Sequence, residues 1–204
     1  MATKQRGRPR SFDRDTALHQ AMLTFWEHGY ETTSIADLTR VMGIGAPSLY
    51  AAFGDKRALF AEVVEVYAAG YGSYATRALA EEPTARAAVA RVLREAAGLF
   101  TDPGHPRGCL MVSAAVNCTA PDVETALREQ RAAQFADFER GIDADVAAGV
   151  LPGGTDAGAL ARFSGAVLQG MAHQARDGAT EEELARVAEL AMRAWPEEPA
   201  GRGA

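Results

Sequence analysis

Apolar residues recur every three or four positions along almost the whole chain of 204 residues. This period is typical of α-helices that each bury one face. The first stripe ends at Gly29 and comprises Leu18, Ala21, Met22, Phe25 and Trp26. The sustained alternation of apolar and polar residues that predicts strands does not occur. The pattern therefore predicts an all-α fold of about nine helices.

Two short helices joined by a tight turn are predicted directly after this first stripe. Ser34 with Asp37 three residues later has the spacing of a helix N-cap, in which each residue satisfies a backbone N–H of the other. Gly43 suits the left-handed conformation that ends a helix. Pro47 suits the first turn of the next helix, which Gly54 ends. This spacing predicts a helix-turn-helix.

Longer helices are predicted in the rest of the chain. Asp55 is expected to cap a helix that continues to about Leu79, and another helix is expected to reach Phe100 before a turn-rich loop. An N-cap is expected at Thr119–Asp122, and a capping box is formed by Thr180 with Glu183. Further helices are then expected at 109–117, 119–148, 157–175 and 181–194.

These breaks predict a division of the chain into four segments. A disordered basic arm at 1–11 is followed by the helix-turn-helix domain at 12–57, a larger helical domain at 58–195 and a disordered tail at 196–204. No internal repeat is found. The two ordered segments are long enough to form hydrophobic cores without metal or disulfide support.

Charge is unevenly divided along the chain. The formal net charge is −6, but residues 1–57 carry eight basic and six acidic side chains, and the remainder carries 13 basic and 21 acidic ones. The first ten residues hold four basic residues and no acidic one. Such an arm can contact nucleic acid phosphates, although a solvated chain end is the alternative.

Membrane and secretory classes are not expected. The longest nearly apolar stretch, Cys109–Val116, is far shorter than the roughly 20 residues that span a bilayer. The basic start at Lys4–Arg10 is followed by charged residues instead of the apolar segment of a signal peptide. Two cysteines do not form a multi-bridge framework. We therefore expect a cytoplasmic protein without a membrane partner.

No catalytic centre is expected either. The segment Gly43–Ser48 matches half of a dinucleotide-binding fingerprint, but it lacks the third glycine and a preceding strand. The four histidines have no metal-ligand spacing, and no Gly-x-Ser-x-Gly motif occurs. We therefore expect no enzyme, no resident metal and no cofactor.

The helix-turn-helix region resembles a known family. The residues that carry the resemblance are Gly29–Ile35, Gly43-Ile44, Ser48-Leu49-Tyr50, Phe53, Lys56 and Leu59, and they are similar to the signature of TetR/AcrR-type transcriptional regulators. The resemblance is specific over about residues 12–60. It implies an N-terminal three-helix domain that binds double-stranded DNA and a larger C-terminal domain that binds a small-molecule effector and pairs with a second copy.

The resemblance also implies DNA contacts. Thr33 and Ser34 match positions that offer donors to a phosphate, although both also suit simple caps, and Tyr50 and Lys56 match phosphate-contacting positions. The small residues of the second helix would face base edges. Gly45 departs from the family, which often has Ser or Thr there. The full set of expected contacts is Arg6, Arg8, Arg10, Thr33, Ser34, Gly45, Ala46, Pro47, Ser48, Tyr50 and Lys56.

For the larger domain, the resemblance implies an effector pocket and a dimer interface. The expected pocket residues, any of which could instead belong to the core, are Tyr67, Tyr71, Phe100, Met111, Asn117, Phe135, Phe138 and Met171. The last two helices would form a four-helix bundle with the partner copy through Leu160, Phe163, Val167, Leu184, Val187 and Ala191. A ligand-released repressor acting on a palindromic operator is the function expected.

Two other functions stay open at this point. Cys109 and Cys118, with nearby sequence similar to a copper-responsive subgroup of the family, suggest a thiol or copper sensor. A helix over 109–118 would place the two cysteines ~13.5 Å apart, beyond disulfide reach, which favours buried hydrophobes. The other possibility is an all-α small-molecule carrier that does not bind DNA.

Overall fold

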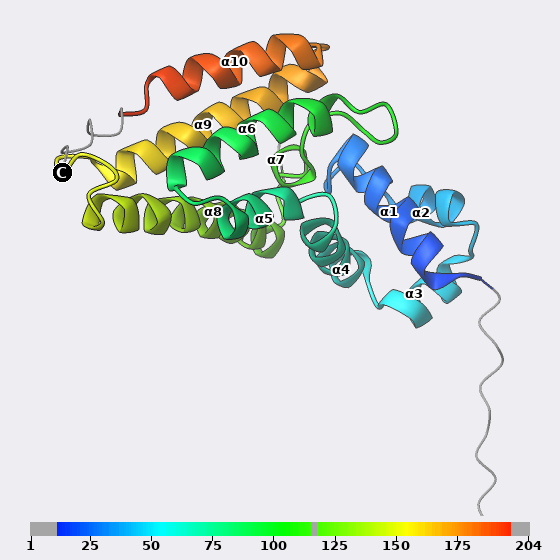
Figure 1. Cartoon of the computed structure of the whole chain (residues 1–204). Coiled ribbons are helices and arrows are strands. Elements are labelled where there is room, and N and C mark those ends of the chain that lie inside the picture. Colours follow the sequence, from blue (N-terminus) through cyan, green and yellow to red (C-terminus); the bar gives the residue numbers. More distant parts are fainter. Residues whose placement is uncertain (1–11, 116–117, 197–204) are drawn as a thin grey trace, which may run out of the picture.

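The computed structural model describes residues 12–115 and 118–196, which form ten helices and no strand. Nine of these helices have at least eight residues, and the tenth, α7 (Leu110–Ser113), has four. Figure 1 shows the three N-terminal helices to one side of the others. The all-α prediction is confirmed.

The three N-terminal helices are α1 (Arg14–His28), α2 (Ile35–Met42) and α3 (Ala46–Phe53), and we call them the head. The predicted capping box is present at the start of α2, where the side chains of Ser34 and Asp37 each accept from the other's backbone N–H. Gly29 and Gly43 end α1 and α2 with φ of 83° and 65°, values that glycine adopts without strain. The helix-turn-helix therefore has the boundaries that the sequence predicts.

The helix expected from Asp55 to about Leu79 is interrupted. It is divided into α4 (Lys56–Ala69) and α5 (Ser73–Glu81) by a turn that contains Gly70 and Gly72. A Cβ at Gly72 would lie 3.3 Å from the carbonyl oxygen of Tyr67 and 3.2 Å from the Cα of Ala68. The chain therefore turns where two glycines weaken the helix and permit this close approach.

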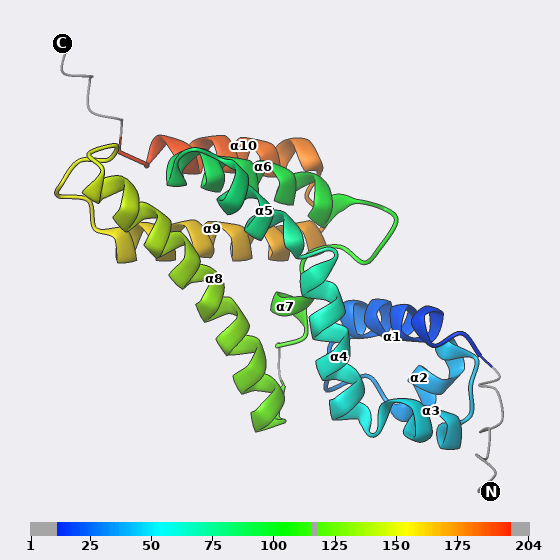
Figure 2. The same ribbon diagram turned by 60° about the horizontal axis from the view of Figure 1, so that its bottom comes forward.

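The remaining helices are α6 (Ala85–Thr101), α8 (Pro121–Ala147), α9 (Ala157–Arg176) and α10 (Glu181–Arg193). We call α5, α6, α8, α9 and α10 the body. Figure 2 shows α4 between this group and the head. The predicted capping box of Thr180 with Glu183 opens α10.

One prediction around α7 is wrong. The helix expected over 109–117 is only Leu110–Ser113, so the rigid spacing assumed for the two cysteines does not hold. The N-cap of α8 is Ala120, within the predicted interval 119–122, and it makes no side-chain capping bond. Instead, the backbone N–H and the hydroxyl of Thr119 donate to the carboxylate of Glu31, at 3.1 and 2.8 Å. A long-range contact with the head replaces the local cap.

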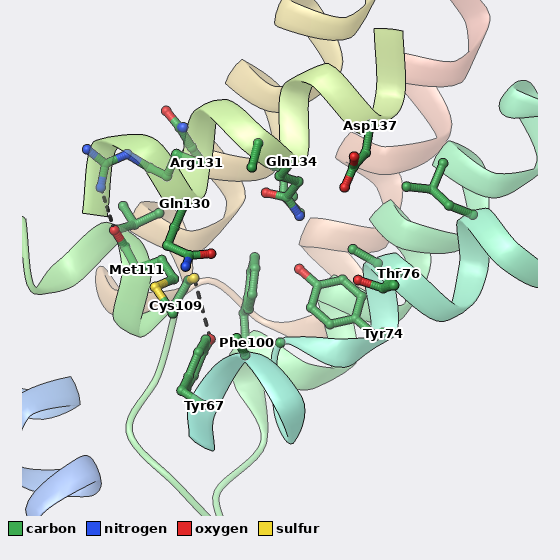
Figure 3. A pocket seen from close by; sticks show the side chains of 18 residues that line it. Tyr67, Tyr74, Thr76, Phe100, Cys109, Met111, Gln130, Arg131, Gln134 and Asp137 are labelled. Atoms are coloured by element: carbon green, nitrogen blue, oxygen red, sulfur yellow. Dashed lines mark hydrogen bonds between the residues drawn. The ribbon is translucent and has the colours of Figure 1, made fainter. Parts of the chain in front are cut away.

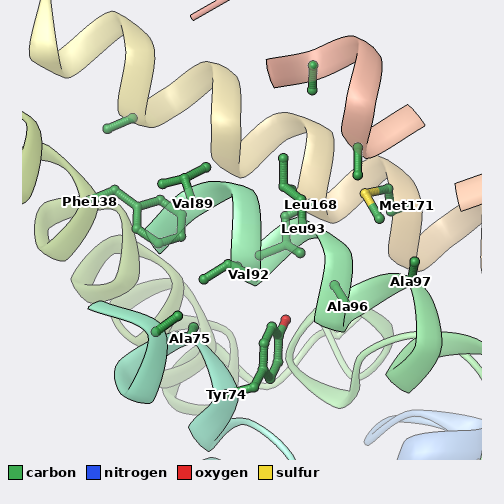
Figure 4. Close-up of a cluster of buried hydrophobic side chains, with 14 of the residues drawn as sticks. Tyr74, Ala75, Val89, Val92, Leu93, Ala96, Ala97, Phe138, Leu168 and Met171 are labelled. Atoms are coloured by element: carbon green, nitrogen blue, oxygen red, sulfur yellow. The ribbon is translucent and has the colours of Figure 1, made fainter. Parts of the chain in front are cut away.

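Two hydrophobic clusters form the core. One joins α5, α6, α9 and α10 with the second half of α8, and Figure 4 shows part of it around Val92 and Leu168. The other includes the head, α4, α7 and the first two turns of α8. The head is therefore not packed on itself alone, because its core continues across α4 to Leu110 and Leu127.

Candidate DNA-binding face and effector cavity

One face of α3 is open to solvent. Leu49 and Phe53 are buried and hold this helix against the rest of the head. The opposite face carries Pro47 and, one turn later, Tyr50 and Ala51. Tyr50 is 50% exposed. Of the other predicted contact residues in this region, Gly45 is exposed, and Ala46 and Ser48 are partly buried.

Arg14 fixes the end of α3 relative to its neighbours. Its guanidinium donates to both carboxylate oxygens of Glu62 in α4, at 2.5 and 2.7 Å, and to the carbonyl of Ala52 at 3.4 Å. It also lies 4.5 Å from the ring centroid of Phe53. A bidentate pair combined with an aromatic contact restrains orientation as well as distance. Sequence analysis did not identify this residue, because its partners are 38 to 48 positions away.

The turn before α2 uses its hydroxyls internally. Thr33 is buried and its hydroxyl donates to the carbonyl of Gly29 at 2.7 Å, so it is not available to a phosphate in this arrangement. The hydroxyl of Ser34 donates to Asp37 at 2.6 Å and accepts from the backbone N–H of Asp37 at 3.1 Å. These two residues therefore have the capping roles that the sequence also allowed.

Lys56 lies in the first turn of α4, beside the same turn. Its ammonium is 4.3 Å from the ring centroid of Tyr30 and 3.4 Å from the carbonyl oxygen of Glu31, to which it donates. Partial burial lowers the pKa of Lys56. The charge is held at the edge of the head by the aromatic ring and the carbonyl. The predicted arginines of the arm, Arg6, Arg8 and Arg10, lie outside the described residues.

A cavity of about 170 Å³ opens between α4, α5, α7 and α8. Its apolar wall includes Phe100, Val112 and Leu168, and its polar wall includes Tyr74, Gln130 and Gln134. Figure 3 shows the Tyr74 hydroxyl and the Gln134 side chain turned toward each other across this space. The cavity therefore combines apolar surface with several groups that can donate or accept a hydrogen bond.

The groups that face the cavity are mostly uncharged. Burial raises the pKa of Tyr67 and of Tyr74 well above the ordinary value of a phenol, so both are hydrogen-bond donors. Burial also raises the pKa of Cys109, and the Tyr67 hydroxyl contacts its sulfur at 3.4 Å. Arg131 donates to the carbonyl of Met111 at 2.7 Å and points away from the centre (Figure 3). Asp137 pairs with Arg140 one turn along α8.

The structure separates the predicted pocket residues into groups. Tyr67, Phe100 and Met111 line the cavity. Tyr71 lies in an aromatic cluster next to Trp26, and Phe138 and Met171 are buried in the core. Phe135 packs against α9 at Gly165, and Asn117 lies outside the described residues.

Most polar residues of the cavity were missed by sequence analysis. Gln130, Arg131 and Gln134 follow Leu127 by three, four and seven positions, on the face of α8 that also carries Phe138. Polar residues on the inward face of an amphipathic helix were the signal that could have identified them. Tyr74, Thr76 and Gln169 gave no such signal.

An apolar face of α9 and α10 has no covering helix within residues 12–115 and 118–196. Phe163 is 39% exposed and Leu190 is 59% exposed, and Leu160, Val167 and Val187 are partly buried. Of the predicted interface residues, Leu184 and Ala191 are buried within the chain itself, so their side chains do not face a partner. Leu190 was not among the predicted residues.

The described part of the chain holds neither a candidate metal centre nor a candidate membrane span. No three His, Cys, Asp or Glu side chains come together there in a way that could hold a metal ion. No helix there is long and apolar enough to cross a membrane. Cys109 and Cys118 are both free thiols.

Comparison with known proteins agrees with this geometry. Residues 17–63 match the family described as "Bacterial regulatory proteins, tetR family". The chain is 38% identical to the HTH-type transcriptional repressor ComR of Escherichia coli (strain K12), over 95% of this chain and 94% of that protein. It is 29% identical to the HTH-type transcriptional repressor BdcR of the same organism, over 94% and 95% of the two chains.

A solved structure supports the same assignment. A cysteine-substituted variant of the TetR family regulator CifR, complexed with a 26-base-pair double-strand operator DNA, is 45% identical in sequence and has a TM-score of 0.89. The match covers 93% of this chain and 100% of the CifR chain. This chain belongs to the TetR family and is a DNA-binding transcriptional regulator.

Proposed function

We propose that this chain is a homodimeric repressor that reads a palindromic operator with α3 and is released when a small molecule occupies the cavity. The observation that carries the proposal is the exposed face of α3 on a head whose orientation is fixed by Arg14. It is supported by the similarity to CifR, whose structure contains operator DNA. The proposal includes no catalytic step.

The DNA contacts follow from the exposed side chains. Tyr50 and Lys56 contact phosphates and set the register of the head on the duplex. Ala46, Pro47 and Ser48 face base edges, where small side chains read thymine methyl groups and groove shape. Arg6, Arg8 and Arg10 lie along phosphates or in a minor groove, which attracts arginine where it is narrow.

Dimerisation uses the apolar face of α9 and α10. Phe163 and Leu190 are its exposed members, with Leu160, Val167 and Val187 at their sides. A two-fold axis through this face places two heads on one duplex. Half-sites one helical turn apart, roughly 34–36 Å, make the operator palindromic.

The effector is a compact, uncharged molecule with at least one hydrogen-bond acceptor. Tyr67 and Tyr74 are neutral donors, and the charge of Arg131 is directed at a backbone carbonyl. Of the charged residues that line the cavity, Arg131 bonds to this carbonyl and Asp137 pairs with Arg140, so a charged ligand would be desolvated without a free counter-charge. Release of DNA requires that the effector binds the DNA-free conformation more tightly than the DNA-bound one.

DNA recognition is tested with a duplex from the chain's own upstream region. Lys56→Ala weakens binding to all duplexes and lowers the dependence of log Kd on log salt by about one. Arg57→Ala is the control, because Arg57 is exposed and pairs with Asp122. Ser48→Ala changes the preferred sequence and leaves the salt dependence as it was. An unchanged slope for Lys56→Ala contradicts its phosphate contact.

The dimer and the effector are tested separately. Phe163→Glu converts the protein to a monomer in sedimentation experiments and abolishes retardation of the duplex, whereas Glu139→Gln, an exposed change on α8, affects neither. Native mass spectrometry of freshly purified protein identifies a retained ligand, and Tyr74→Phe lowers the affinity for it. A ligand that binds the Tyr74→Phe variant equally well contradicts the assigned contact.

A thiol sensor is a second candidate, because Cys109 lines the cavity and contacts the Tyr67 hydroxyl. Cys109→Ala would then bind DNA normally and lose release by oxidant or by copper. Normal release of that variant excludes the thiol mechanism. The third alternative, a carrier that does not bind DNA, is wrong, because the chain is a DNA-binding regulator.

A further inference from the structure

One loop of the chain extends from the effector cavity to the head. Residues 102–109 connect α6 to α7, and both Figure 1 and Figure 2 show this loop reaching toward α1. Its last residue, Cys109, lines the cavity. Its middle residue, His105, contacts Trp26 of α1. The loop therefore contacts both the cavity and the head, which must be coupled if an effector in the cavity is to release the DNA.

His105 completes an aromatic box around Trp26. Its ring lies 4.4 Å from the Trp26 ring centroid, at an interplanar angle of 20°. Tyr67 of α4 and Tyr71 of the turn after α4 meet the same indole edge-on, at 5.0 and 5.2 Å. Trp26 has no solvent exposure, so these three rings help to fix the last turns of α1.

The second half of the loop is held against the end of α9. Gly108 has a φ of 82°, and its backbone N–H donates to the carbonyl of Phe100 at 2.9 Å. A Cβ at this position would lie 2.7 Å from the carbonyl oxygen of Ala172. Arg107 donates to the carbonyl of Ala179 at 2.5 Å. Residues 107 and 108 are therefore tightly packed between Cys109 and His105, so a displacement of Cys109 that moves them against α9 also moves His105.

The same turn of α9 also holds α1. Arg176 donates to the carbonyls of Trp26 and Glu27, at 3.3 and 2.9 Å. A guanidinium at the C-terminal end of a helix satisfies carbonyls that have no partner within the helix. The last turn of α1 is thus bound on one side by α9 and on the other by His105.

The stacked pair itself is held by packing. The indole Nε1 of Trp26 and the Nε2 of His105 are buried and have no hydrogen-bond partner among the described residues. Stacked rings without a directional bond can slide at low cost compared with the bonded contacts of Arg176. The His105–Trp26 contact is therefore the part of this connection that can move.

We propose that the loop of residues 102–109 transmits occupancy of the cavity to the head, and that His105 is the positioning residue that acts on α1 through Trp26. This inference rests on the proposed function, because it concerns the regulation of the same cavity. A ligand that displaces Cys109 moves the loop from its cavity end. Tyr67 gives a parallel route, since it contacts both Cys109 and Trp26. We assign to His105 a larger share of the coupling between the cavity and Trp26 than to Tyr67.

Fluorine NMR of the full chain labelled with 5-fluorotryptophan tests the proposal without knowledge of the effector. The chain has two tryptophans, so Trp26 gives one resonance and Trp195 gives an internal reference. Ala133→Phe fills the cavity from α8, and Ala133→Leu is the milder version. Ala132→Phe is the matched control, because Ala132 and Ala133 are both exposed on the same helix but only Ala133 lines the cavity.

We expect Ala133→Phe to move the Trp26 resonance by more than its linewidth and to leave the Trp195 resonance in place. Ala132→Phe moves neither. In the His105→Ala background the response of Trp26 to Ala133→Phe falls below half of its wild-type size, and His105→Phe, which keeps a stacking ring, restores it. A response of more than half in the His105→Ala background assigns the connection to α4 and overturns the proposal. No response in the wild-type background overturns it as well.

DNA binding separates this inference from the function on which it rests. The Kd of Ala133→Phe for the upstream duplex should exceed that of wild type, and the ratio of the two should be closer to one in the His105→Ala background. His173→Ala, an exposed histidine on α9, leaves that ratio unchanged. If the Trp26 resonance moves and the DNA affinity does not, the connection exists but the proposed release from the cavity is wrong.

Discussion

The head and the body are packed in different ways. Among the 20 buried residues of the cluster around the head, six are aromatic and three are alanine. Among the 23 of the body cluster, four are aromatic and 11 are alanine. Large interlocking rings leave the head one way to pack, whereas small residues let the body helices approach closely and shift. The difference teaches that the cavity lies at the boundary between the two, with one wall from α4 and α7 and the other from body helices that can shift.

The largest expected effect is in the head. Phe25 is fully buried and meets Phe60 edge-on at 5.0 Å. Phe25→Ala should lower the free energy of unfolding by about 3–5 kcal/mol, measured by urea denaturation. Tyr50→Ala, which removes an exposed ring from the same head, should change it by less than about 0.5 kcal/mol. Similar losses for the two variants would contradict the difference in packing.

A close approach in the body is the next target. A Cβ at Gly165 of α9 would lie 2.1 Å from Cε1 of Phe135 in α8. Gly165→Ala should therefore lower the free energy of unfolding by about 1–3 kcal/mol, because the ring must move. Phe135→Leu makes room and should recover part of the loss in the double variant. Additive losses would show that the two residues are not in contact.

The two capping boxes compare the regions directly. Ser34 caps α2 in the head, and Thr180 caps α10 in the body, with the same reciprocal bonds to an acidic residue three positions on. Ser34→Ala and Thr180→Ala should each lower the free energy of unfolding by about 0.5–2 kcal/mol. Hydrogen exchange of backbone amides shows which helix is destabilised by each change. Faster exchange in α10 of the Ser34→Ala variant would contradict the local effect of the cap.

The smallest expected effect is a dependence on pH. Hydrogen bonds from Ser34 and Arg40 lower the pKa of Asp37 from 3.8 to about 2. Because the folded state favours the ionised carboxylate, its contribution is complete above the unfolded value and is lost as the pH falls toward 2. Wild type should therefore exceed Asp37→Asn in stability near neutral pH, and the two should converge in acid. Parallel urea midpoints at all pH values would contradict the shift.

Local signals predicted the head well. Ser34, Gly43 and Asp55 act within one helical turn of the positions where helices begin and end, so their roles follow from neighbours in sequence. The helix between Asp55 and Leu79 was predicted as continuous because its apolar period continues through Gly70, where the chain turns. The start of α8 was predicted within 119–122, but the bonds from Thr119 to Glu31 were not, because the two residues are 88 positions apart.

The candidate sites show the same limit. The face of α3 was predicted from spacing and resemblance, since one short helix carries it. The polar wall of the cavity was not predicted from the sequence, because Tyr74, Gln134 and Gln169 belong to three different helices that only the fold brings together. Arg14, His105 and Arg176 also act on residues far away in the chain.

The sequence by itself determined the helical class, the ends of the short helices, the family and the division of charge between a basic start and an acidic remainder. These depend on periodicity, caps and composition, which are local quantities. Only the tertiary structure decided which inward residues line a cavity, which apolar residues remain exposed on α9 and α10, and that a loop connects the cavity to Trp26. Such properties depend on contacts between segments that are distant in the sequence. One pattern of apolar and polar residues is compatible with many different sets of these contacts.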